Sequence, residues 1–430
     1  MDLNKLYQQK KASVDECLNL IRDNDRIVFG KERNEPVMFC DRLHTLKGRV
    51  SGVTALKGRT GNNEFLRTEG MGESIMTHAD FYGLHWSSYQ NMGNALFVAT
   101  AINDAAAYYG EFWDPNVFVA AVCPMDEEGN FQVGMSLMWE KDFYDRHPEK
   151  VILEVNPNIP RTHGGFLINI NDVTALYEND QALSEITPMP FTDVEAKIGE
   201  YVASLVKDGD TIQLGIGGIP DAVAKKLQDH KDLGLHTEMF TTEIGRMIKK
   251  GVITGERKNF HKGEHLGVFI SGLQELYDTV SSNEKCIFMP GSYVVDPMNI
   301  MKNDNMVSIN TCIEMDLTGQ VCGESVGTRQ VSGPGGCFAF AYGAIHSKGG
   351  RGILAFPSKT AKGYSKIKST LTPGAQVTIP RPYVDCIVTE YGIAYMRGRT
   401  LTQRVHNLVA IAHPDDRAEL LRQARELHYI

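Results

Sequence analysis

One order of local signals occurs twice in this chain, and this repeat limits the fold more than any other feature. Thr192 and Glu195 form the T-x-x-E signature of a helix N-terminus, and apolar residues follow at helical spacing. Residues 208–210 (DGD) interrupt the helix and precede a short apolar strand. Gly215 then begins a turn, and Pro220 begins the next helix.

The same order is present near the N-terminus. An S-x-x-E signature at 13–16 precedes a helix, and a short apolar strand closed by Gly30 follows. Asp25 and Gly30 are five residues apart, as are Asp210 and Gly215. We therefore expect two similar α/β halves.

Near-continuous apolar runs at 95–99, 117–122 and 151–155 are typical of buried parallel strands, and a helix is expected at 103–109. Further strands are expected at 267–270, 286–289, 306–310, 352–356, 376–379 and 386–389. This alternation predicts two similar open α/β domains, each with a mostly parallel sheet flanked by helices.

The chain is too long for one compact core, because it has 430 residues of which 42% are hydrophobic. Pro188 and Pro190 form the natural linker. We therefore expect an N-terminal domain at 1–188 and a C-terminal domain at 189–430.

Composition argues against several classes of protein. The net charge of -9 and the lack of a basic stripe argue against nucleic acid as a partner. The N-terminus lacks the apolar core of a signal peptide, and no run is long enough to span a membrane. The eight cysteines form no C-x-x-C pair, so reduced thiols in a cytoplasmic protein are expected.

A metal site is not expected. The thirteen histidines form no H-E-x-x-H motif. His261 and His265 have the H-x-x-x-H spacing, but Gly263 lies between them in a segment that resembles a loop.

A carboxylate follows the second glycine turn at a position where it can do chemistry. Glu238, in the stretch DLGLHTEMF at 232–240, comes about 20 residues after LGIGGIP at 214–220. A glycine turn after a strand can present backbone N–H groups to an anion, and a carboxylate at the same sheet edge can act as a nucleophile. A single Glu is more often a solvated surface charge.

Two further glycine-rich turns lie in the second half, SGPGG at 332–336 and SKGG at 347–350. Each alone is more often an ordinary turn. Three such turns in one chain favour a ligand that needs several convergent N–H donors.

Long phrases from about Val151 to the C-terminus are similar to the family I CoA-transferases, in their acetyl-CoA hydrolase/transferase branch. The matching phrases are EVNPNIPRTHG (154–164), LGIGGIPDAV (214–223), DLGLHTEMF (232–240), KGVITGERK (250–258), NDNMVSIN (303–310), DLTGQVCGESVGT (316–328), SKGGRGILAFPS (347–358), VTEYGIAYMRGRTL (388–401) and IAHPDDR (411–417). The two halves would then be the N- and C-terminal CoA-transferase domains, the second carrying the catalytic Glu.

The resemblance implies a role for each matching residue. Glu238 would be the nucleophile, and Asn310 with the amides of Gly335 or Gly336 would stabilise the oxyanion. The substrate- and CoA-binding residues would be Gly215, Gly217, Gly218, Arg161, His163, Lys348 and Gly349. The loop with Arg161 and His163 would lie across the cleft from Glu238, on the other domain.

The implied reaction moves CoA from acetyl-, succinyl- or butyryl-CoA to a short-chain carboxylate such as 4-hydroxybutyrate, butyrate or itaconate. It would proceed through a covalent glutamyl-CoA thioester in ping-pong fashion, with CoA as a substrate and no permanently bound cofactor. The partners would be an acyl-CoA and a small carboxylate, and the resemblance favours a homo-oligomer, a dimer or tetramer.

The chain departs from the family pattern at three places. The usual turn SGVGGQVDF is SGPGGCFAF at 332–340, which introduces Cys337 and Ala339. The usual SDG after the nucleophile is TTE at 241–243. Residues 77–94 do not match and resemble a glycine-punctuated loop, read either as a divergent surface loop or as a reshaped acyl pocket.

A dicarboxylate acceptor such as itaconate or succinate would need a cation or several donors for its second carboxylate. The candidates are Arg161, His78, His85 and Arg246. The sequence leaves open an acyl-CoA hydrolase that uses the same glutamate and, less favoured, a non-catalytic CoA-binding protein. A Rossmann dehydrogenase is disfavoured, because LGIGGIP does not fit G-x-G-x-x-G.

Overall fold

A computed structural model of the chain describes residues 2–58, 64–83, 85–188 and 190–430. It divides into two compact units. The first contains Met1–Ile186 and Gly267–Tyr293, and the second contains Thr187–Leu266 and Val294–Ile430. The boundary expected after residue 188 lies close to Ile186, where the first segment of the first unit ends. A single boundary is not enough, because the later segment Gly267–Tyr293 also belongs to the first unit.

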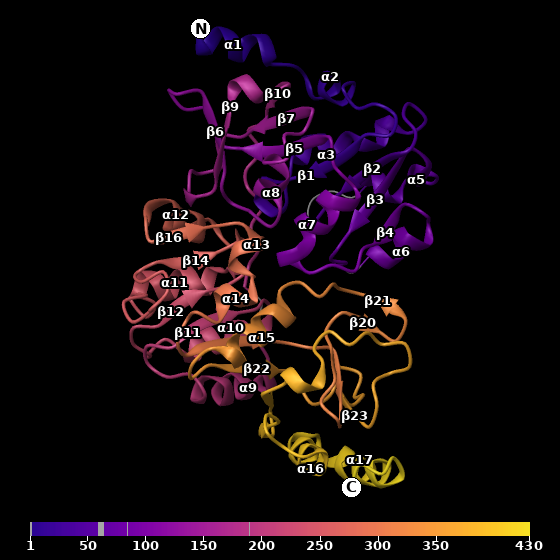
Figure 1. Cartoon of the computed structure of the whole chain (residues 1–430), viewed down its shortest axis with the longest axis vertical. Helices are drawn as coiled ribbons and strands as arrows, with labels where there is room; N and C mark the ends of the chain where they lie inside the picture. Colours follow the sequence, from indigo (N-terminus) through magenta and orange to yellow (C-terminus); the bar gives the residue numbers. More distant parts are fainter. Residues whose placement is uncertain (1, 59–63, 84, 189) are drawn as a thin grey trace. The chain divides into compact units, whose positions relative to one another are not determined.

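The first unit is built on a parallel sheet. Its strands lie in the order β10 (Ala175–Glu178), β7 (Lys150–Val155), β5 (Val117–Val122), β1 (Arg26–Phe29), β2 (Val53–Leu56), β3 (Ile75–Ala79) and β4 (Ala95–Phe97), as Figure 1 shows. Every neighbouring pair in this sheet is parallel. The first unit also contains the antiparallel pair β6 (Asn130–Val133) and β9 (Phe166–Asn169), and β8 (His163–Gly164) beside β16 (Cys286–Phe288).

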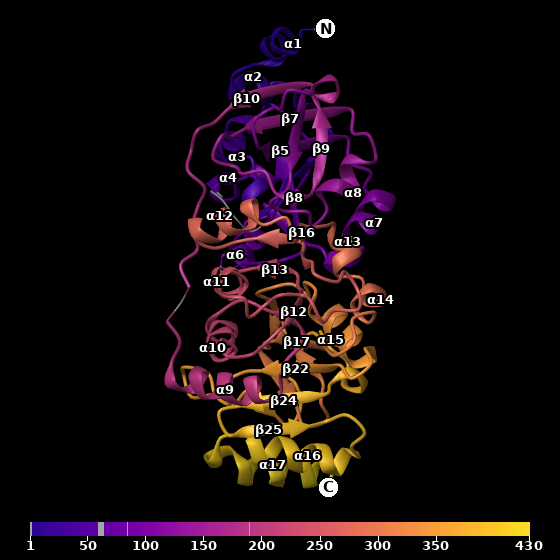
Figure 2. The ribbon, with the colours of Figure 1, turned by 90° about the vertical axis from the view of Figure 1, so that its left-hand side faces the viewer.

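The second unit has a sheet of the same kind. Its strands lie in the order β25 (Gly392–Tyr395), β24 (Cys386–Thr389), β22 (Arg351–Ala355), β17 (Met306–Asn310), β11 (Thr211–Leu214), β12 (Gly234–His236) and β14 (His265–Gly267). Neighbouring strands in this order are parallel except for β24 with β25. Figure 2 shows α16 (Leu401–Ile411) and α17 (Pro414–Glu426) beyond β25, as the amphipathic pattern of the C-terminus requires.

Helices and short strands complete the units. The other helices are α1 (Leu3–Lys10), α2 (Val14–Leu18), α3 (Val37–Arg42), α4 (Glu64–Arg67), α5 (Met71–Ser74), α6 (Trp86–Asn91), α7 (Ile102–Phe112), α8 (Glu140–Tyr144), α9 (Asp193–Ser204), α10 (Gly218–Lys226), α11 (Thr242–Lys250), α12 (Gln274–Ser282), α13 (Gly291–Val294), α14 (Pro297–Ile300) and α15 (Cys337–His346). The short strands are β13 (Met239–Phe240), β15 (Phe269–Ile270), β18 (Glu314–Asp316), β19 (Val321–Cys322), β20 (Ser325–Val326), β21 (Arg329–Gln330) and β23 (Ile367–Lys368). The strand expected at 376–379 is wrong, because only Ile379 forms a bridge there, to Val321.

The two sheets repeat each other down to individual ion pairs. Asp25 and Asp210, which precede β1 and β11, each accept a hydrogen bond from the backbone N–H three residues earlier. Asp25 also lies 2.7 Å from Nζ of Lys150, the first residue of β7, and Asp210 pairs with Arg351, the first residue of β22. Since β7 and β22 each lie two strands from the aspartate's strand, the expected similarity of the two α/β domains is confirmed.

Arg33 explains why Gly267–Tyr293 belongs to the first unit. Its guanidinium is buried and donates to the hydroxyl groups of Tyr277 at 2.8 Å and Ser271 at 2.9 Å, and to Ser184 at 2.6 Å. These partners lie far from Arg33 in the sequence. One buried cation therefore fastens the returning segment to the loop after β1.

The loop after β1 carries charges into the interior. Glu35 pairs with Lys57 at 2.8 Å, and their side chains are 1% and 0% exposed. Lys31 pairs with Asp80 at 2.9 Å, and its ammonium lies 3.3 Å from the ring centre of Trp139. In both of these pairs the buried charge has an opposite charge beside it, which lowers the cost of burial.

Residues 77–94 are not a surface loop, so that interpretation is wrong. They contain the end of β3 and α6, and the side chains of Trp86 and Tyr89 are buried. The rings of Tyr82 and Trp86 stack with centroids 5.6 Å apart. These aromatic residues belong to the hydrophobic core of the first unit, which their large apolar area favours.

Candidate active site

The glycine turn lies at the carboxyl end of β11, where α10 begins. Gly217 caps α10 with a φ of +112°, and a Cβ added there would meet no atom within 4 Å. A Cβ on Gly218 would instead lie 2.5 Å from Oε1 of Glu195. Gly217 therefore borders open space, whereas Gly218 allows α10 to pack closely on the start of α9.

Glu238 follows β12 at the same edge of the sheet, and the residue before it fixes the backbone. Thr237 donates its N–H to the carbonyl of Leu266 at 3.0 Å and its hydroxyl to that of Leu214 at 3.3 Å. Thr237 is fully buried, and Glu238 is half-buried. The backbone that carries the Glu238 side chain is therefore fixed to both neighbouring strands, β11 and β14.

His236 supports this strand as a neutral group. One ring nitrogen, Nε2, lies 2.7 Å from the carbonyl of Val294, and Nδ1 lies 3.0 Å from the side-chain nitrogen of Asn303. These partners require a proton on Nε2 and a free lone pair on Nδ1. Burial lowers the pKa of His236 to about 3, so it carries no charge toward Glu238.

Gly336 contacts the Glu238 carboxylate directly. Its backbone N–H donates to Oε2 of Glu238 at 3.0 Å, and Gly336 is the N-cap of α15. A Cβ on Gly336 would lie 2.5 Å from the same oxygen. A helix N-terminus favours a negative charge, and only glycine allows this approach. The structure therefore brings together two of the residues singled out from the sequence.

The neighbours of this hydrogen bond are largely apolar. A Cβ on Gly336 would also lie 2.9 Å from Val295 and 3.2 Å from Phe340. Burial, together with the nearby Cys312 and Glu238, raises the pKa of the Cys337 thiol to about 12. Cys337 is therefore a protonated thiol, which is the weakly nucleophilic form of the residue.

Asn310 ends β17 and is paired with a residue that the sequence analysis missed. Its side-chain amide and that of Gln213 in β11 exchange two hydrogen bonds of 3.1 Å. Gln213 also accepts the N–H of Ile309 at 3.2 Å. The available signal was a polar residue inside an apolar strand. A Cβ on Gly215 would lie 3.8 Å from Asn310 Oδ1, so Asn310 and the glycine turn are neighbours.

Lys348 and Gly349 lie at the other end of the strands. They precede β22, and the carbonyl of Lys348 accepts the N–H of Asn305, which precedes β17. The Lys348 side chain is 87% exposed and 3.6 Å from Asp304. Because parallel strands share one carboxyl edge, the structure does not bring these two residues to Asn310 and Glu238.

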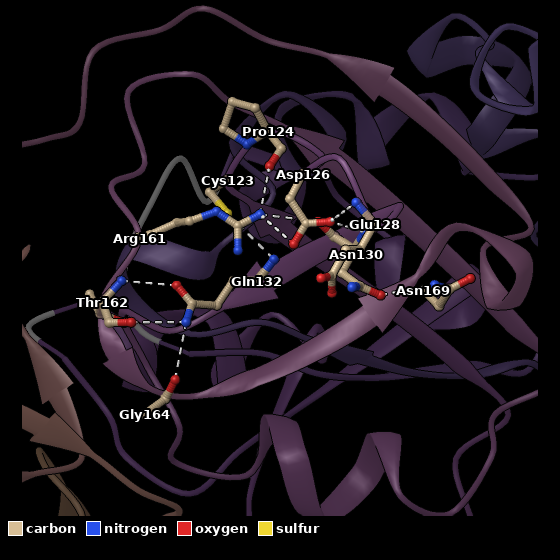
Figure 3. A network of polar contacts seen from close by, with 10 residues as sticks. All are labelled: Cys123, Pro124, Asp126, Glu128, Asn130, Gln132, Arg161, Thr162, Gly164 and Asn169. Atoms are coloured by element: carbon tan, nitrogen blue, oxygen red, sulfur yellow. Dashed lines mark hydrogen bonds and ion pairs between the residues drawn. The ribbon is translucent and has the colours of Figure 1, made fainter. Parts of the chain in front are cut away.

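The loop with Arg161 and His163 belongs to the first unit and is held there by its own contacts (Figure 3). Arg161 lies 3.2 Å from Asp126 and donates to the carbonyls of Asn130 and Pro124 at 3.1 and 3.3 Å. His163 contacts the carbonyl of Ser281 at 3.2 Å. The cation of Arg161 is thus already engaged within its own unit.

The other candidates for binding a second carboxylate differ in their surroundings. Arg246, on α11, lies 2.5 Å from Glu243. Burial lowers the pKa of His78, whose ring packs against Trp113 with centroids 5.7 Å apart. His85 is exposed just before α6.

Lys258 is a buried cation that the sequence analysis did not single out. Its ammonium donates to the carbonyls of Leu235 at 3.0 Å and Glu264 at 2.8 Å. A Cβ on Gly234 would lie 2.5 Å from its side chain, so Lys258 packs directly on β12. Burial lowers its pKa to about 7. Lys258 therefore braces the strand that leads to Glu238.

Among the residues that the structure describes, no group of three or more His, Cys, Asp or Glu side chains is arranged to hold a metal ion. None of the helices described is long and apolar enough to cross a membrane.

Known proteins match the chain over both of its halves. Residues 1–188 match the acetyl-CoA hydrolase/transferase N-terminal domain, and residues 272–424 match the C-terminal domain of the same name. The 4-hydroxybutyrate coenzyme A transferase of Clostridium kluyveri is 38% identical, over 99% of this chain and 100% of its own.

Solved structures extend the comparison. The 4-hydroxybutyrate CoA-transferase of Porphyromonas gingivalis is 36% identical with a TM-score of 0.81, over 99% of this chain and 100% of its own. RipA of Yersinia pestis is 30% identical with a TM-score of 0.92, over the full length of both chains. This chain therefore belongs to the acetyl-CoA hydrolase/transferase family, as an enzyme of the CoA-transferase type.

Proposed function

We propose that this enzyme moves CoA from an acyl-CoA to a short-chain carboxylate through a covalent thioester on Glu238. The observation that carries the proposal is the hydrogen bond from the Gly336 N–H to Oε2 of Glu238. This donor orients the carboxylate in the ground state. The same donor can bind the oxygen that becomes negative when the glutamyl carbonyl is attacked.

The first half-reaction loads CoA onto the enzyme. The Glu238 carboxylate attacks the thioester carbonyl, the C–S bond breaks, and CoA leaves as a thiolate. The thiolate then attacks the glutamyl carbonyl of the mixed anhydride, which gives a glutamyl-CoA thioester and releases the donor's carboxylate. Electrons and atoms balance without an added reagent.

The second half-reaction runs these steps in reverse with another carboxylate. The acceptor attacks the glutamyl thioester, CoA thiolate leaves, and the thiolate then attacks the acceptor's carbonyl. Glu238 returns as a free carboxylate. We assign the stabilisation of the tetrahedral oxyanions to the Gly336 N–H and the Asn310 amide, and each such donor contributes about 3 kcal/mol.

The proposed donors are acetyl-, succinyl- and butyryl-CoA, and the proposed acceptors are 4-hydroxybutyrate, butyrate and itaconate. Relatives support this range, because their names refer to 4-hydroxybutyrate, to butyrate and to succinyl-CoA. Val295 and Phe340 beside Gly336 favour an apolar acyl chain, and Arg246 is already paired with Glu243. Among these acceptors we therefore favour a monocarboxylate.

The remaining assignments are part of the same proposal. CoA acts as a substrate and not as a permanently bound cofactor. All eight cysteines are free thiols, which supports a cytoplasmic location. We propose a homo-oligomer, a dimer or tetramer, from the family alone.

Trapping tests the mechanism. The enzyme is incubated with each acyl-CoA, treated with borohydride, digested, and analysed by mass spectrometry. We expect the reduced glutamyl group at Glu238, with none in Glu238→Gln and full labelling in the control Glu200→Gln, whose carboxylate is exposed on α9. Turnover that leaves Glu238 unlabelled overturns the covalent mechanism. Loss of CoA without transfer to any added carboxylate identifies a hydrolase.

A further inference from the structure

The contact between Glu238 and Gly336 depends on how α15 lies against β12. Glu238 follows β12, whereas Gly336 caps α15, and the N–H of Gly336 lies 3.0 Å from Oε2 of Glu238. The two residues are 98 positions apart, so nothing local in the chain fixes this distance. The side chains that join the strand to the helix therefore decide the geometry of the candidate active site.

His236, the last residue of β12, packs against α15 with its ring. The side chain is fully buried, and its ring meets the ring of Phe340 edge-on, with centroids 6.2 Å apart. Phe340 lies one turn after Gly336, and a Cβ on Gly336 would lie 3.2 Å from the Phe340 ring. Edge-to-face rings have a preferred geometry, so His236 fixes the first turn of α15 relative to β12.

The ring of His236 also holds the segment that borders Gly336. Its Nε2 donates to the carbonyl oxygen of Val294 at 2.7 Å. The next residue, Val295, is fully buried, and its Cγ1 would lie 2.9 Å from a Cβ on Gly336. His236 therefore contacts both the helix that carries Gly336 and the segment that packs against Gly336.

Asn303 fixes the orientation of that ring and connects it to the other end of α15. Its side-chain nitrogen donates to Nδ1 of His236 at 3.0 Å and to the carbonyl of Ile300 at 3.1 Å. The second bond fixes which end of the amide faces the ring, so Nδ1 accepts and Nε2 carries the proton. The carbonyl of Asn303 accepts the hydroxyl of Ser347, the C-cap of α15, at 2.5 Å. β12 is therefore joined to α15 near both ends of the helix.

An unpaired atom of Asn303 indicates why an amide is present at this position. The side chain is fully buried, and its Oδ1 has no hydrogen-bond partner among the residues that the structure describes. A buried acceptor without a partner destabilises a fold, and an apolar side chain of similar size would avoid this cost. The amide is therefore present for its nitrogen, which orients His236.

Lys258 also braces β12 but does not join it to α15. Its ammonium donates to the carbonyls of Leu235 and Glu264, which lie in β12 and directly before β14. Both of these contacts are made to the sheet and its loop. Lys258 therefore fixes the strand, whereas His236 fixes the distance from the strand to the helix.

These contacts give His236 a role in the reaction. We propose that His236 is a positioning residue, oriented by Asn303, which holds α15 against β12 so that the Gly336 N–H stays on the Glu238 carboxylate. Both nitrogens of the ring are bound by protein groups, so His236 acts neither as an acid nor as a base. This inference rests on the proposed function, in which Glu238 is the nucleophile.

Steady-state transfer from acetyl-CoA tests the proposal. In His236→Leu we expect kcat to fall about 10²-fold and the KM for acetyl-CoA to change less than about twofold, because the carboxylate is misplaced while the rest of the substrate site is intact. His236→Gln, whose amide can still donate to Val294, should recover about tenfold of that loss. The matched control His230→Leu removes another ring that bonds a carbonyl, that of Val206 at 3.1 Å, and should turn over as the wild type does. Wild-type kcat in H236L overturns the proposal.

Asn303 should act only through His236. Asn303→Leu keeps the volume of the side chain but removes the donor to Nδ1, so we expect kcat to fall about tenfold. The double variant H236L/N303L should be no slower than H236L. Losses that multiply would contradict the assignment of Asn303. Because N303L leaves the His236 ring in place, a wild-type kcat in N303L counts against the proposal even if H236L does not fold.

Hydrogen exchange separates this inference from the proposed function. Glu238 protects the amide of Gly336 in the resting enzyme, and exchange followed by mass spectrometry over residues 332–340 needs no turnover. We expect exchange in this peptide to be about tenfold faster in H236Q and N303L than in the wild type, and unchanged in H230L. If the proposed function is wrong, Glu238 is not trapped in the wild type, yet the faster exchange remains. Normal trapping beside unchanged exchange contradicts the role of His236 alone.

Discussion

The backbone N–H of Gly336 donates a hydrogen bond of 3.0 Å to Oε2 of Glu238. The two residues are 98 positions apart in the sequence, and each follows a different strand of the second unit. A helix N-terminus and a carboxylate attract each other, so this contact orients the carboxylate that we propose as the nucleophile and places a donor at the proposed reacting centre.

Changes at Glu238 should separate charge from position. Glu238→Gln removes the nucleophile, and we expect kcat to fall at least about 10³-fold. Glu238→Asp keeps the charge but withdraws it by one methylene, so a fall of about 10²-fold is expected. Steady-state transfer assays measure both. Equal loss in the two variants would contradict a role that depends on charge.

A methyl group at position 336 should displace the nucleophile. In Gly336→Ala the new Cβ would lie 2.5 Å from Oε2 of Glu238, so the carboxylate must move. We expect kcat to fall about 10²-fold. The control is Gly323→Ala, where the nearest side-chain atom lies 3.6 Å away. Normal turnover in G336A would show that the contact is dispensable.

Gln213 should act only through Asn310. If the Asn310 amide stabilises the oxyanion, Asn310→Ala lowers kcat about 10²- to 10³-fold with little change in KM. Gln213→Leu removes the two hydrogen bonds that orient the Asn310 side chain. We therefore expect kcat to fall by a smaller factor, about tenfold. The double variant should lose no more than N310A. Additive losses would give Gln213 a separate role.

Local signals in the sequence were enough to predict the two repeated α/β halves, whereas the role proposed for Glu238 came from the resemblance to the family. The caps, strands and glycine turns depend on residues close together in the chain, and the ion pairs of Asp25 and Asp210 show how faithfully they repeat. The resemblance to the family implied that Glu238 and the amide of Gly335 or Gly336 belong to one site, because both lie in motifs of the family.

Features that depend on partners distant in the sequence could not be predicted from it. Nothing in the sequence around Arg33 indicates that it binds Tyr277 and Ser271, so the sequence analysis did not predict that Gly267–Tyr293 belongs to the first unit. Lys258 reads as a surface lysine until its contacts with β12 are known. Lys348 lies in a glycine-rich motif of the family, but a motif does not show at which end of a strand its turn lies. Lys348 precedes β22 and therefore lies at the opposite end of the strand from Asn310 and Glu238.

The pKa of Lys258 should make stability depend on pH. Its pKa is about 7 in the folded chain and near 10.5 when unfolded, so the unfolded state binds more protons between these values. Wild-type stability should therefore rise relative to Lys258→Met as pH increases from 7 toward 10, by about 1.4 kcal/mol per pH unit. Urea unfolding at pH 7, 8 and 9 measures this. The prediction would be contradicted if wild type and Lys258→Met changed in parallel with pH. It would also be contradicted if the difference between wild type and the control Lys231→Met grew with pH to the same extent.

Replacing one member of the buried pair of Lys57 and Glu35 should cost more stability than replacing both. Lys57→Met leaves the Glu35 carboxylate in an interior where its side chain is 1% exposed, so we expect a loss of about 3 to 5 kcal/mol in the free energy of unfolding. Adding Glu35→Gln removes the buried negative charge and should recover most of that loss. Chemical unfolding of the single and double variants measures both values. A double variant as unstable as K57M would mean that the packing of the lysine stem, and not the charge, supports this part of the first unit.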